Sequence, residues 1–428
     1  MFLSDTQFPP STYAATATLP ALRPALQGTA QADVCIVGVG FTGLYTALRL
    51  AQAGQRVVVL EASRVGWGAS GRNGGQIILG FSCDMPPFER ALGMEGARRV
   101  WQLVRDAAAE IRHHVATHQI DCELRDGHLW TSVLQRRVDL LPHWQQEAAE
   151  RWGYERLRFI PKAELPQHVA SERYEAGLLD PEGGHLHPLK YVLGLARAAE
   201  AAGVSLHDDS AVQSYSLEGD GVRVRTAHGE VRAHRLVLAC NAYIHTLNPA
   251  LRARVLPVGT YMIGTEPLGE ARAKALLPTG LAVTDNQFIL DYFRLTQDHR
   301  LLFGGKCTYT GRTPHNLTDA MRGDMLRVFP QLADVKIAHA WGGHIDITVP
   351  RTPDFGHDGP VYWVQGFSGH GLVPTAVAGR VLAEAILGRG DDLALFERMP
   401  KLRFPGGEML GGLSQAVGMA YYRLRDYL

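Results

Sequence analysis

The 428-residue sequence has little cysteine and no cysteine pair at CxxC spacing. Its five cysteines are dispersed along the chain: Cys35, Cys83, Cys122, Cys240 and Cys307. An odd, scattered set argues against a disulfide framework and against a zinc site, and it favours a reducing compartment. We therefore predict no metal site and a cytoplasmic protein.

The sequence has no excess of either charge, because 43 Lys and Arg residues balance 43 Asp and Glu residues. The two kinds are mixed along the chain. Nucleic-acid binding would need a clustered basic face, so we predict no nucleic-acid partner. No run approaches the roughly 18 apolar residues of a spanning helix, and residues 1–32 lack the basic and apolar regions of a secretory signal. The sequence leaves peripheral membrane contact and the oligomeric state open.

Glycine is abundant, with 46 residues, and the first informative cluster follows a short apolar run. Val34–Val37 predicts a strand buried on both faces, and Gly38-Val-Gly-Phe-Thr-Gly43 follows it directly. In a dinucleotide-binding turn, Gly38 would allow the tight exit, Gly40 the approach of a pyrophosphate, and Gly43 the packing of helix on strand. This spacing predicts a βαβ unit that binds the ADP half of a dinucleotide.

The rest of that unit is present as well. The spacing predicts a helix over Gly43–Gln52, whose N-terminal N–H groups would face the phosphates, and a second buried strand over Val57–Leu60. Glu61 ends this strand, 61 − 38 = 23 residues after Gly38, where an acid binds ribose hydroxyls. A glycine-rich turn in an unrelated α/β protein is the alternative.

Two further glycine-rich segments favour FAD over a nicotinamide cofactor. The first is Gly66-Trp-Gly-Ala-Ser-Gly-Arg-Asn-Gly-Gly-Gln76, close behind the βαβ unit. In the second, the strand Val361–Gln365 leads through Gly366-Phe-Ser-Gly-His-Gly371 into a helix over Thr375–Leu387. The donor-rich start of this helix would suit the flavin N1–C2=O edge, where negative charge accumulates on reduction. An ordinary helix cap is the alternative.

The remaining patterns predict an α/β protein with a Rossmann-like FAD-binding domain and an interleaved substrate domain on a mainly antiparallel sheet with helices. We expect an N-terminal arm over 1–30, the FAD-binding domain over 31–85, 181–250 and 335–428, and the substrate domain over 86–180 and 251–334. Helices are predicted over 90–118, 136–152, 188–202 and 318–329, strands over 124–133, 204–207 with Val212, 236–242, 255–265, 281–283, 288–295 and 300–304, and a hairpin over 221–233.

These motifs, together with Gly183-Gly-His-Leu-His-Pro188, Trp341-Gly-Gly and Arg351-Thr-Pro-Asp-Phe-Gly356, resemble the D-amino-acid-oxidase-like superfamily of FAD enzymes, which includes glycine and sarcosine oxidases. The likeness is greater to its γ-glutamylputrescine oxidase and bacterial L-pipecolate oxidase group. The resemblance implies FAD bound by these residues: Gly38, Gly40, Phe41, Thr42, Gly43, Glu61, Ala62, Trp67, Gly68, Ala69, Ser70, Arg72, Asn73, Gly74, Gly75, Gln76, Val212, Asn241, Ala242, Trp341, Gly342, Gly369, His370, Gly371 and Leu372. We expect the FAD to be non-covalent, because the sequence around Cys307 does not match an attachment motif strongly; a covalent link through Cys307 is the alternative.

The resemblance also implies the chemistry. A C–H bond next to an amine nitrogen is oxidised, a hydride equivalent reaches flavin N5, and water hydrolyses the imine, with dioxygen as the expected acceptor. The flavin carries this reaction, so no catalytic side chain is assigned. The leading substrate hypothesis is a small cyclic amino acid such as L-pipecolate, and the alternative is γ-glutamylputrescine or another polyamine-derived amine. A non-catalytic or electron-transfer flavoprotein and an NAD-dependent dehydrogenase are alternatives of other classes.

The candidate substrate residues lie mainly in the last third of the sequence. Arg351 could bind a carboxylate bidentately, or pair with Asp354 as a structural residue. Lys306 could supply the positive charge that activates oxygen, or be a solvated lysine. Further candidates for the substrate cavity are Tyr261, Tyr292, His344, Asp346 and His370.

Overall fold

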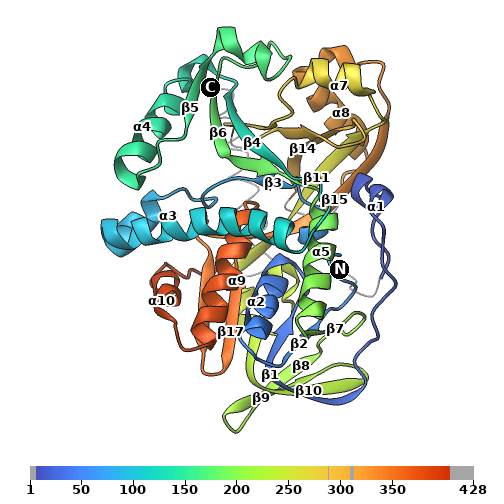
Figure 1. The fold of residues 1–428 in the computed structure, drawn as a ribbon, viewed down its shortest axis with the longest axis vertical. Helices are drawn as coiled ribbons and strands as arrows, with labels where there is room; N and C mark the ends of the chain where they lie inside the picture. The colour runs from blue at the N-terminus through green and yellow to red at the C-terminus, as the bar shows by residue number, and fades with distance from the viewer. Residues whose placement is uncertain (1–5, 288, 309–312, 405–428) are drawn as a thin grey trace.

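The computed structural model describes residues 6–287, 289–308 and 313–404. Two sheets organise these residues, one in the lower and one in the upper half of the molecule (Figure 1). The first sheet has the strand order β16-β17-β10-β1-β2-β7, and β9 and β8 extend it beside β10. Its strands are β1 (Gly28–Val37), β2 (Val57–Leu60), β7 (Ser205–His207), β8 (Ser214–Glu218), β9 (Gly221–Arg225), β10 (Gly229–Leu238), β16 (Asp354–Asp358) and β17 (Val361–Gln365).

The centre of the first sheet is parallel, as the βαβ pattern predicts. β1 pairs in parallel with both β2 and β10, and β10 pairs in parallel with β17. All four residues of β2 are buried, because Val57 and Val59 belong to the apolar cluster under the helices, while Val58 and Leu60 belong to a second apolar cluster on the other face. The covering helices are α2 (Phe41–Gln52), α5 (Pro188–Ala201) and α9 (Leu372–Ile386) (Figure 1). This arrangement confirms the predicted Rossmann-like α/β fold.

The second sheet has the order β15-β11-β14-β13-β12-β4-β6-β3, with β5 beside β6. Its pairs are antiparallel except β12 with β4, which agrees with the predicted mainly antiparallel sheet. The strands are β3 (Gln76–Ile77), β4 (Arg125–Ser132), β5 (Arg158–Pro161), β6 (Ala176–His185), β11 (Val255–Thr265), β12 (Ala282–Asp285), β13 (Tyr292–Leu295), β14 (Leu301–Thr308) and β15 (Ile337–Thr348). The longer helices beside it are α4 (Leu140–Trp152) and α8 (Leu317–Val328).

Helix α3 (Pro86–Thr117) crosses the molecule between the two sheets (Figure 1). It includes most of the helix predicted over 90–118, starts four residues earlier (90 − 86), and is kinked at Gly93, where φ is 76°. Its apolar side packs against α9 in the core of the first sheet. The domain boundary predicted at residue 335 does not coincide with a change of sheet. The strand that follows it, β15, pairs with β11 of the second sheet.

Three local expectations differ from the structure. The second strand of the predicted hairpin and the strand predicted at 236–242 form one continuous strand, β10, because the chain runs straight from the hairpin edge into the sheet. Val212 lies in a loop after β7 instead of in a strand. The strand predicted over 288–295 begins at Tyr292, and Phe288 lies outside the described residues.

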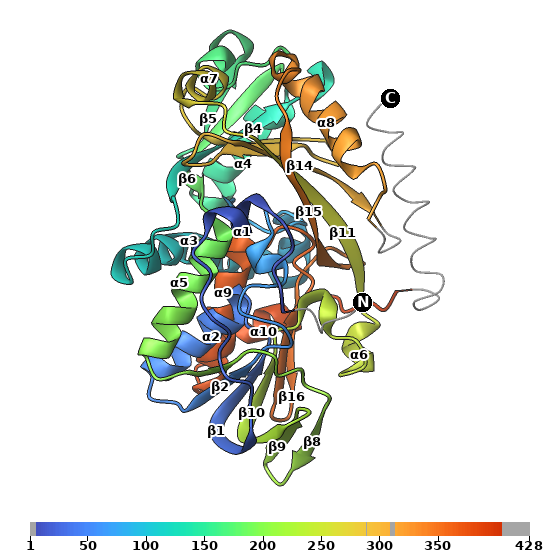
Figure 2. The same ribbon diagram turned by 90° about the vertical axis from the view of Figure 1, so that its right-hand side faces the viewer.

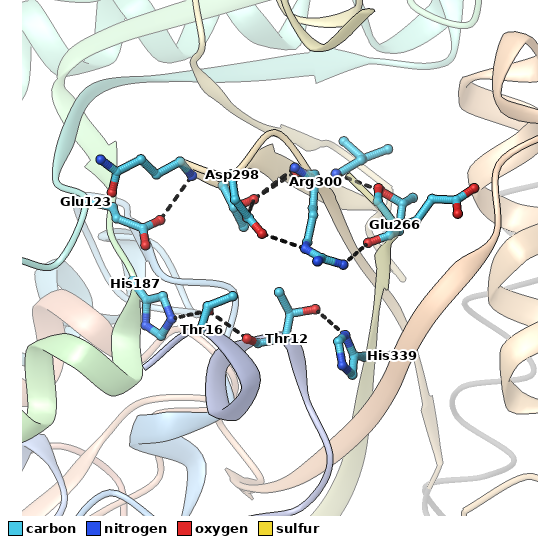
Figure 3. A network of polar contacts seen from close by, with 12 residues as sticks. Thr12, Thr16, Glu123, His187, Glu266, Asp298, Arg300 and His339 are labelled. Atoms are coloured by element: carbon cyan, nitrogen blue, oxygen red, sulfur yellow. Dashed lines mark hydrogen bonds and ion pairs between the residues drawn. The ribbon is translucent and has the colours of Figure 1, made fainter. Parts of the chain in front are cut away.

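The N-terminal arm predicted over 1–30 is partly buried. The short helix α1 (Thr12–Thr16) places Tyr13 at 0 % exposure. Polar contacts hold α1: Thr12 Oγ1 lies 3.3 Å from His339 Nδ1, and Thr16 Oγ1 lies 3.1 Å from His187 Nε2 (Figure 3). Beyond α1 the chain runs down one side of the molecule to β1 (Figure 2). The segment therefore ties the second sheet to α5.

Among the described residues, no helix is both long and apolar enough to cross a bilayer.

Candidate flavin and substrate site

A cavity of about 1130 Å³ is lined by residues of both sheets, and nearly all the predicted cofactor residues meet there. Those in the lining are Gly38, Gly40, Phe41, Thr42, Glu61, Ala62, Trp67, Gly68, Ala69, Ser70, Arg72, Asn73, Gly74, Gly75, Gln76, Val212, Asn241, Trp341, Gly369, His370, Gly371 and Leu372. Gly43, Ala242 and Gly342 are absent from the lining. Segments more than 300 residues apart in sequence, such as Gly38 and Gly369 (369 − 38 = 331), thus form one site.

The first glycine-rich turn is too crowded for side chains. Gly38 has φ of 105°, and a Cβ there would lie 2.5 Å from the carbonyl oxygen of Ala239. A Cβ on Gly43 would lie 2.0 Å from the carbonyl oxygen of Gly38. Gly43 therefore keeps α2 close to the end of β1, which fits its absence from the lining. The result is a tight strand–helix turn that brings backbone N–H groups to the cavity.

Glu61 is fixed at the end of β2 by two backbone hydrogen bonds. Its carboxylate accepts from Val39 N at 2.9 Å and from Ser63 N at 3.0 Å. Burial raises the pKa of Glu61, and these two bonds oppose that effect. Each carboxylate oxygen has lone pairs beyond these bonds, so the group can also accept from the hydroxyls of a ribose.

The segment from Gly66 to Gln76 is braced by its own polar side chains. Ser70 Oγ accepts from Phe41 N at 2.9 Å, at the start of α2. Asn73 Nδ2 donates to Ala69 O at 2.9 Å, and Asn73 Oδ1 accepts from Gly75 N at 2.8 Å. These bonds give the loop a fixed shape along the cavity.

Arg72 links this loop to the second sheet. Its Nε donates to Trp67 O at 2.6 Å, and its guanidinium lies 4.1 Å from the centre of the Trp67 ring. Its Nη1 donates to Gly342 O at 3.2 Å, and Trp341 Nε1 donates back to Arg72 O at 3.0 Å. Arg72, Trp341 and Gly342 therefore act partly by holding the loop against β15.

Sequence reasoning missed Arg294 and Tyr13, which support the same loop from the other side. Arg294 is 1 % exposed, its Nε donates to Gly74 O at 2.9 Å, and its Nη2 donates to Tyr13 Oη at 3.2 Å. Tyr13 also packs edge-on against Trp341, with ring centres 5.3 Å apart. No local motif marks these residues, because their contacts join three distant segments.

The loop after β17 is organised by Asp346. Its Oδ2 accepts from Gly366 N at 2.5 Å, and its backbone oxygen accepts from Ser368 N at 2.9 Å. Burial raises the pKa of Asp346 to about 6. Its Oδ1 is buried and has no hydrogen-bond partner among the residues that the structure describes. His370 follows on this loop, and its Nε2 donates to Ile78 O at 3.1 Å, while burial lowers its pKa.

Five of the seven substrate candidates line the cavity: Arg351, Tyr292, Asp346, Lys306 and His370. The ring of Tyr292 lies close to two glycines. A Cβ added to Gly74 would lie 2.7 Å from this ring, and a Cβ added to Gly304 would lie 2.0 Å from it. Lys306 is not simply solvated, because its Nζ lies 2.5 Å from Asp324 Oδ2. The carboxylate of Asp354, the alternative partner of Arg351, is bound by Arg254 and Lys401.

Tyr261 and His344 do not belong to the lining. Side chains alternate along β11, so Thr260 and Met262 line the cavity while Tyr261 packs in the core on the other face, with its hydroxyl 2.7 Å from Thr308 Oγ1. His344 contributes its backbone oxygen, which accepts from Asn241 Nδ2 at 2.9 Å. The strand alone could not reveal which of its two faces the cavity occupies.

The cavity lining also has an aromatic part, none of whose residues is predicted from the sequence. It holds aromatic side chains from α3, β4 and α4 and from the residues just after α4: Trp101, Trp130, Trp144, Trp152 and Tyr154. These tryptophans belong to no motif that marks a binding site in the sequence. Only the packing of the second sheet against α3 and α4 brings them together.

The fold and the lining define a dinucleotide-binding class of protein, in which residues of both sheets line one cavity. The crowded turn, the fixed acid at the end of β2 and the glycine-rich loops fit FAD, which when bound supplies the acceptor for a hydride equivalent.

Comparison with known proteins gives the family. Residues 33–385 match the FAD dependent oxidoreductase (DAO) family, and the chain belongs to it. It is 41 % identical to γ-glutamylputrescine oxidoreductase of Escherichia coli (strain K12) over 425 residues, covering 99 % of each chain. It is 39 % identical to the probable oxidoreductase OrdL of Haemophilus influenzae over 408 residues, covering 94 % of each.

Solved structures agree on the fold. L-proline dehydrogenase from P. horikoshii superposes with a TM-score of 0.73 at 19 % identity, covering 87 % of this chain and 98 % of that one. Glycine oxidase from Bacillus cereus ATCC 14579 gives 0.71 at 18 % identity, with 87 % and 99 % covered. The protein is an FAD-dependent oxidoreductase, which confirms the predicted enzyme class and cofactor.

Proposed function

We propose that this enzyme oxidises the terminal primary amine of γ-glutamylputrescine. The observation that carries this proposal is the 41 % identity to γ-glutamylputrescine oxidoreductase over 99 % of both chains. It favours the alternative substrate over the L-pipecolate hypothesis, whose only structural support is the presence of Arg351 in the lining.

The reaction needs few protein groups. The carbon next to the terminal amine loses a hydride equivalent to FAD, and the nitrogen loses a proton, which leaves an imine. Water then adds to the imine carbon and ammonia leaves, giving γ-glutamyl-aminobutyraldehyde. The chain's contribution is to hold the amine-bearing carbon and to shield it from bulk water, so a deep, partly apolar cavity suits it. Dioxygen is the proposed acceptor for the reduced cofactor.

Anaerobic reduction of the purified holoenzyme tests this proposal. We expect γ-glutamylputrescine to bleach the oxidised flavin absorbance faster than putrescine, L-pipecolate or glycine at equal concentration. Bleaching by L-pipecolate but not by γ-glutamylputrescine would overturn the proposal. Admission of air then measures the acceptor: rapid return of the absorbance with hydrogen peroxide indicates an oxidase, and slow return indicates a dehydrogenase.

A further inference from the structure

Part of the cavity is lined by five aromatic side chains, which we call the aromatic vestibule: Trp101, Trp130, Trp144, Trp152 and Tyr154. Its rings form two groups. Trp101 lies 6.4 Å from Trp152 and 5.9 Å from Tyr154, while Trp130 and Trp144 meet edge-on at 6.1 Å, all between ring centres. None of the glycine-rich cofactor motifs supplies these residues, so the vestibule is available to the substrate.

Carboxylates line the same cavity as these rings. Glu147 on α4 and Asp84 just before α3 both line the cavity, and Asp180 on β6 lines it too. Asp180 is part of the wall, because it is 5 % exposed and accepts hydrogen bonds from the Tyr154 hydroxyl and from Glu182 N. Asp84 has no ion pair among the residues that the structure describes.

Glu147 lies close enough to Asp84 for its charge to act on that carboxyl. Partial desolvation, and then the negative charge of Glu147, raise the pKa of Asp84 to about 6. Glu147 has a cationic neighbour in Arg151, whose Nε lies 4.0 Å away. A carboxylate whose ionisation is opposed by a neighbouring negative charge, in a cavity with aromatic faces, forms an environment that a cationic group would relieve.

γ-Glutamylputrescine carries such a group at the end away from its reacting amine. Its α-ammonium is separated from the oxidised carbon by an extended chain of roughly 10 Å, at about 1.2 Å per bond as in an extended backbone. A small amine such as glycine cannot reach both ends of the cavity at once. The substrate's distal ammonium therefore needs a receptor some distance from the flavin.

We propose that the aromatic vestibule binds the α-ammonium of the γ-glutamyl group, with Glu147 as its counter-ion and the tryptophan faces around it. This inference rests on the proposed function, and it adds the residues that distinguish a γ-glutamylated amine from a free one. Glu147 is a specificity residue here, because it contacts the distal end of the substrate and takes no part in the reaction.

Two substrates and two matched variants test the inference. γ-Glutamylputrescine and N-glutarylputrescine differ only in the α-amino group, and Glu147→Gln removes only the charge. We expect Glu147→Gln to lower kcat/KM for γ-glutamylputrescine by roughly 10- to 100-fold, the scale of one lost charge-assisted contact, mainly through KM. Turnover of N-glutarylputrescine should change less than about twofold. The control is Glu150→Gln, which lies exposed on the same helix outside the lining and should change neither.

A binding measurement separates the subsite from catalysis. γ-Glutamylbutylamide lacks the oxidisable amine, so its Kd can be measured by tryptophan fluorescence or calorimetry on the holoenzyme. We expect Glu147→Gln to weaken its binding by a similar factor. Equal binding by wild type and variant, or undiminished preference for the α-amino substrate, would overturn the vestibule assignment alone.

The remaining outcomes are also decisive. Failure of the wild type to oxidise γ-glutamylputrescine would overturn the proposed function. Glu147→Gln could instead lower kcat/KM for spermidine and leave kcat/KM for γ-glutamylputrescine unchanged. That result would assign the vestibule to the distal ammonium of free polyamines and overturn the γ-glutamyl assignment.

Discussion

The sharpest structural prediction concerns Gly43, which is absent from the cavity lining. In Gly43→Ala the new Cβ would lie 2.0 Å from Gly38 O, where an ordinary contact needs well over 3 Å. The neighbour is backbone inside a tight turn, so α2 must move away from β1 by about 1 Å. Overpacking of this kind costs about 1–3 kcal/mol. If FAD binding has to restore the native turn, its affinity falls by roughly 5- to 150-fold.

The assay is titration of apoprotein with FAD, together with urea unfolding of the apoprotein. The matched control is Gly323→Ala, because Gly323 lies exposed in α8 with nothing within 4 Å of its added Cβ. That change should stabilise the protein by about 0.4–1 kcal/mol through helix propensity and leave FAD affinity unchanged. A Gly43→Ala protein with wild-type Kd for FAD and an unchanged urea midpoint would refute the packing argument.

Three further variants probe the site. For Asp346 the folded carboxyl titrates at about 6 against an ordinary 3.8, so the folded state holds the extra proton between these values and stability falls as pH rises through that window. Asp346→Asn keeps an acceptor for Gly366 N and should remove this loss of stability, which is about 3 kcal/mol. Urea midpoints measured from pH 4 to 7 would show the difference, and an equally steep pH dependence in the variant would contradict it. Tyr13→Phe leaves a buried N–H of Arg294 unpaired and should cost about 1–3 kcal/mol in urea unfolding, whereas an unchanged midpoint would remove Tyr13 from the loop's support. Lys306→Met should slow flavin reoxidation by air roughly 10²-fold and leave anaerobic reduction unchanged; equal reoxidation in stopped flow would exclude the oxygen-activating role.

The nucleotide-binding half of the fold could be predicted because its constraints are local. Strand, turn, helix and terminal acid follow one another within residues 33–61, and each step has a backbone reason that a single residue type satisfies. Gly38 needs its positive φ, and Gly43 needs its missing side chain. The loops at 66–76 and 366–371 carry similar backbone demands, so they could be found without knowing where they meet.

The substrate end could not be predicted in the same way, because its constraints are long-range. Tyr261 shows the limit: a strand with apolar residues on both faces does not reveal which face the cavity occupies. Arg294 shows another limit, because it donates hydrogen bonds to both Gly74 and Tyr13, and Tyr13 lies 281 residues before it in the sequence. An ordinary Tyr-Phe-Arg-Leu strand gives no sign of either contact.

The two halves of the cavity also differ in how they can change. Cofactor contacts depend on glycines and on a braced loop, where most substitutions disturb the backbone and with it the flavin. The aromatic vestibule is built from side chains on α3, β4 and α4 and from Tyr154, which belong to other segments than the loop at 66–76. Substrate choice can therefore change while flavin binding stays intact. This separation is why Glu147→Gln should alter which amine is oxidised, whereas Gly43→Ala should alter whether FAD is bound at all.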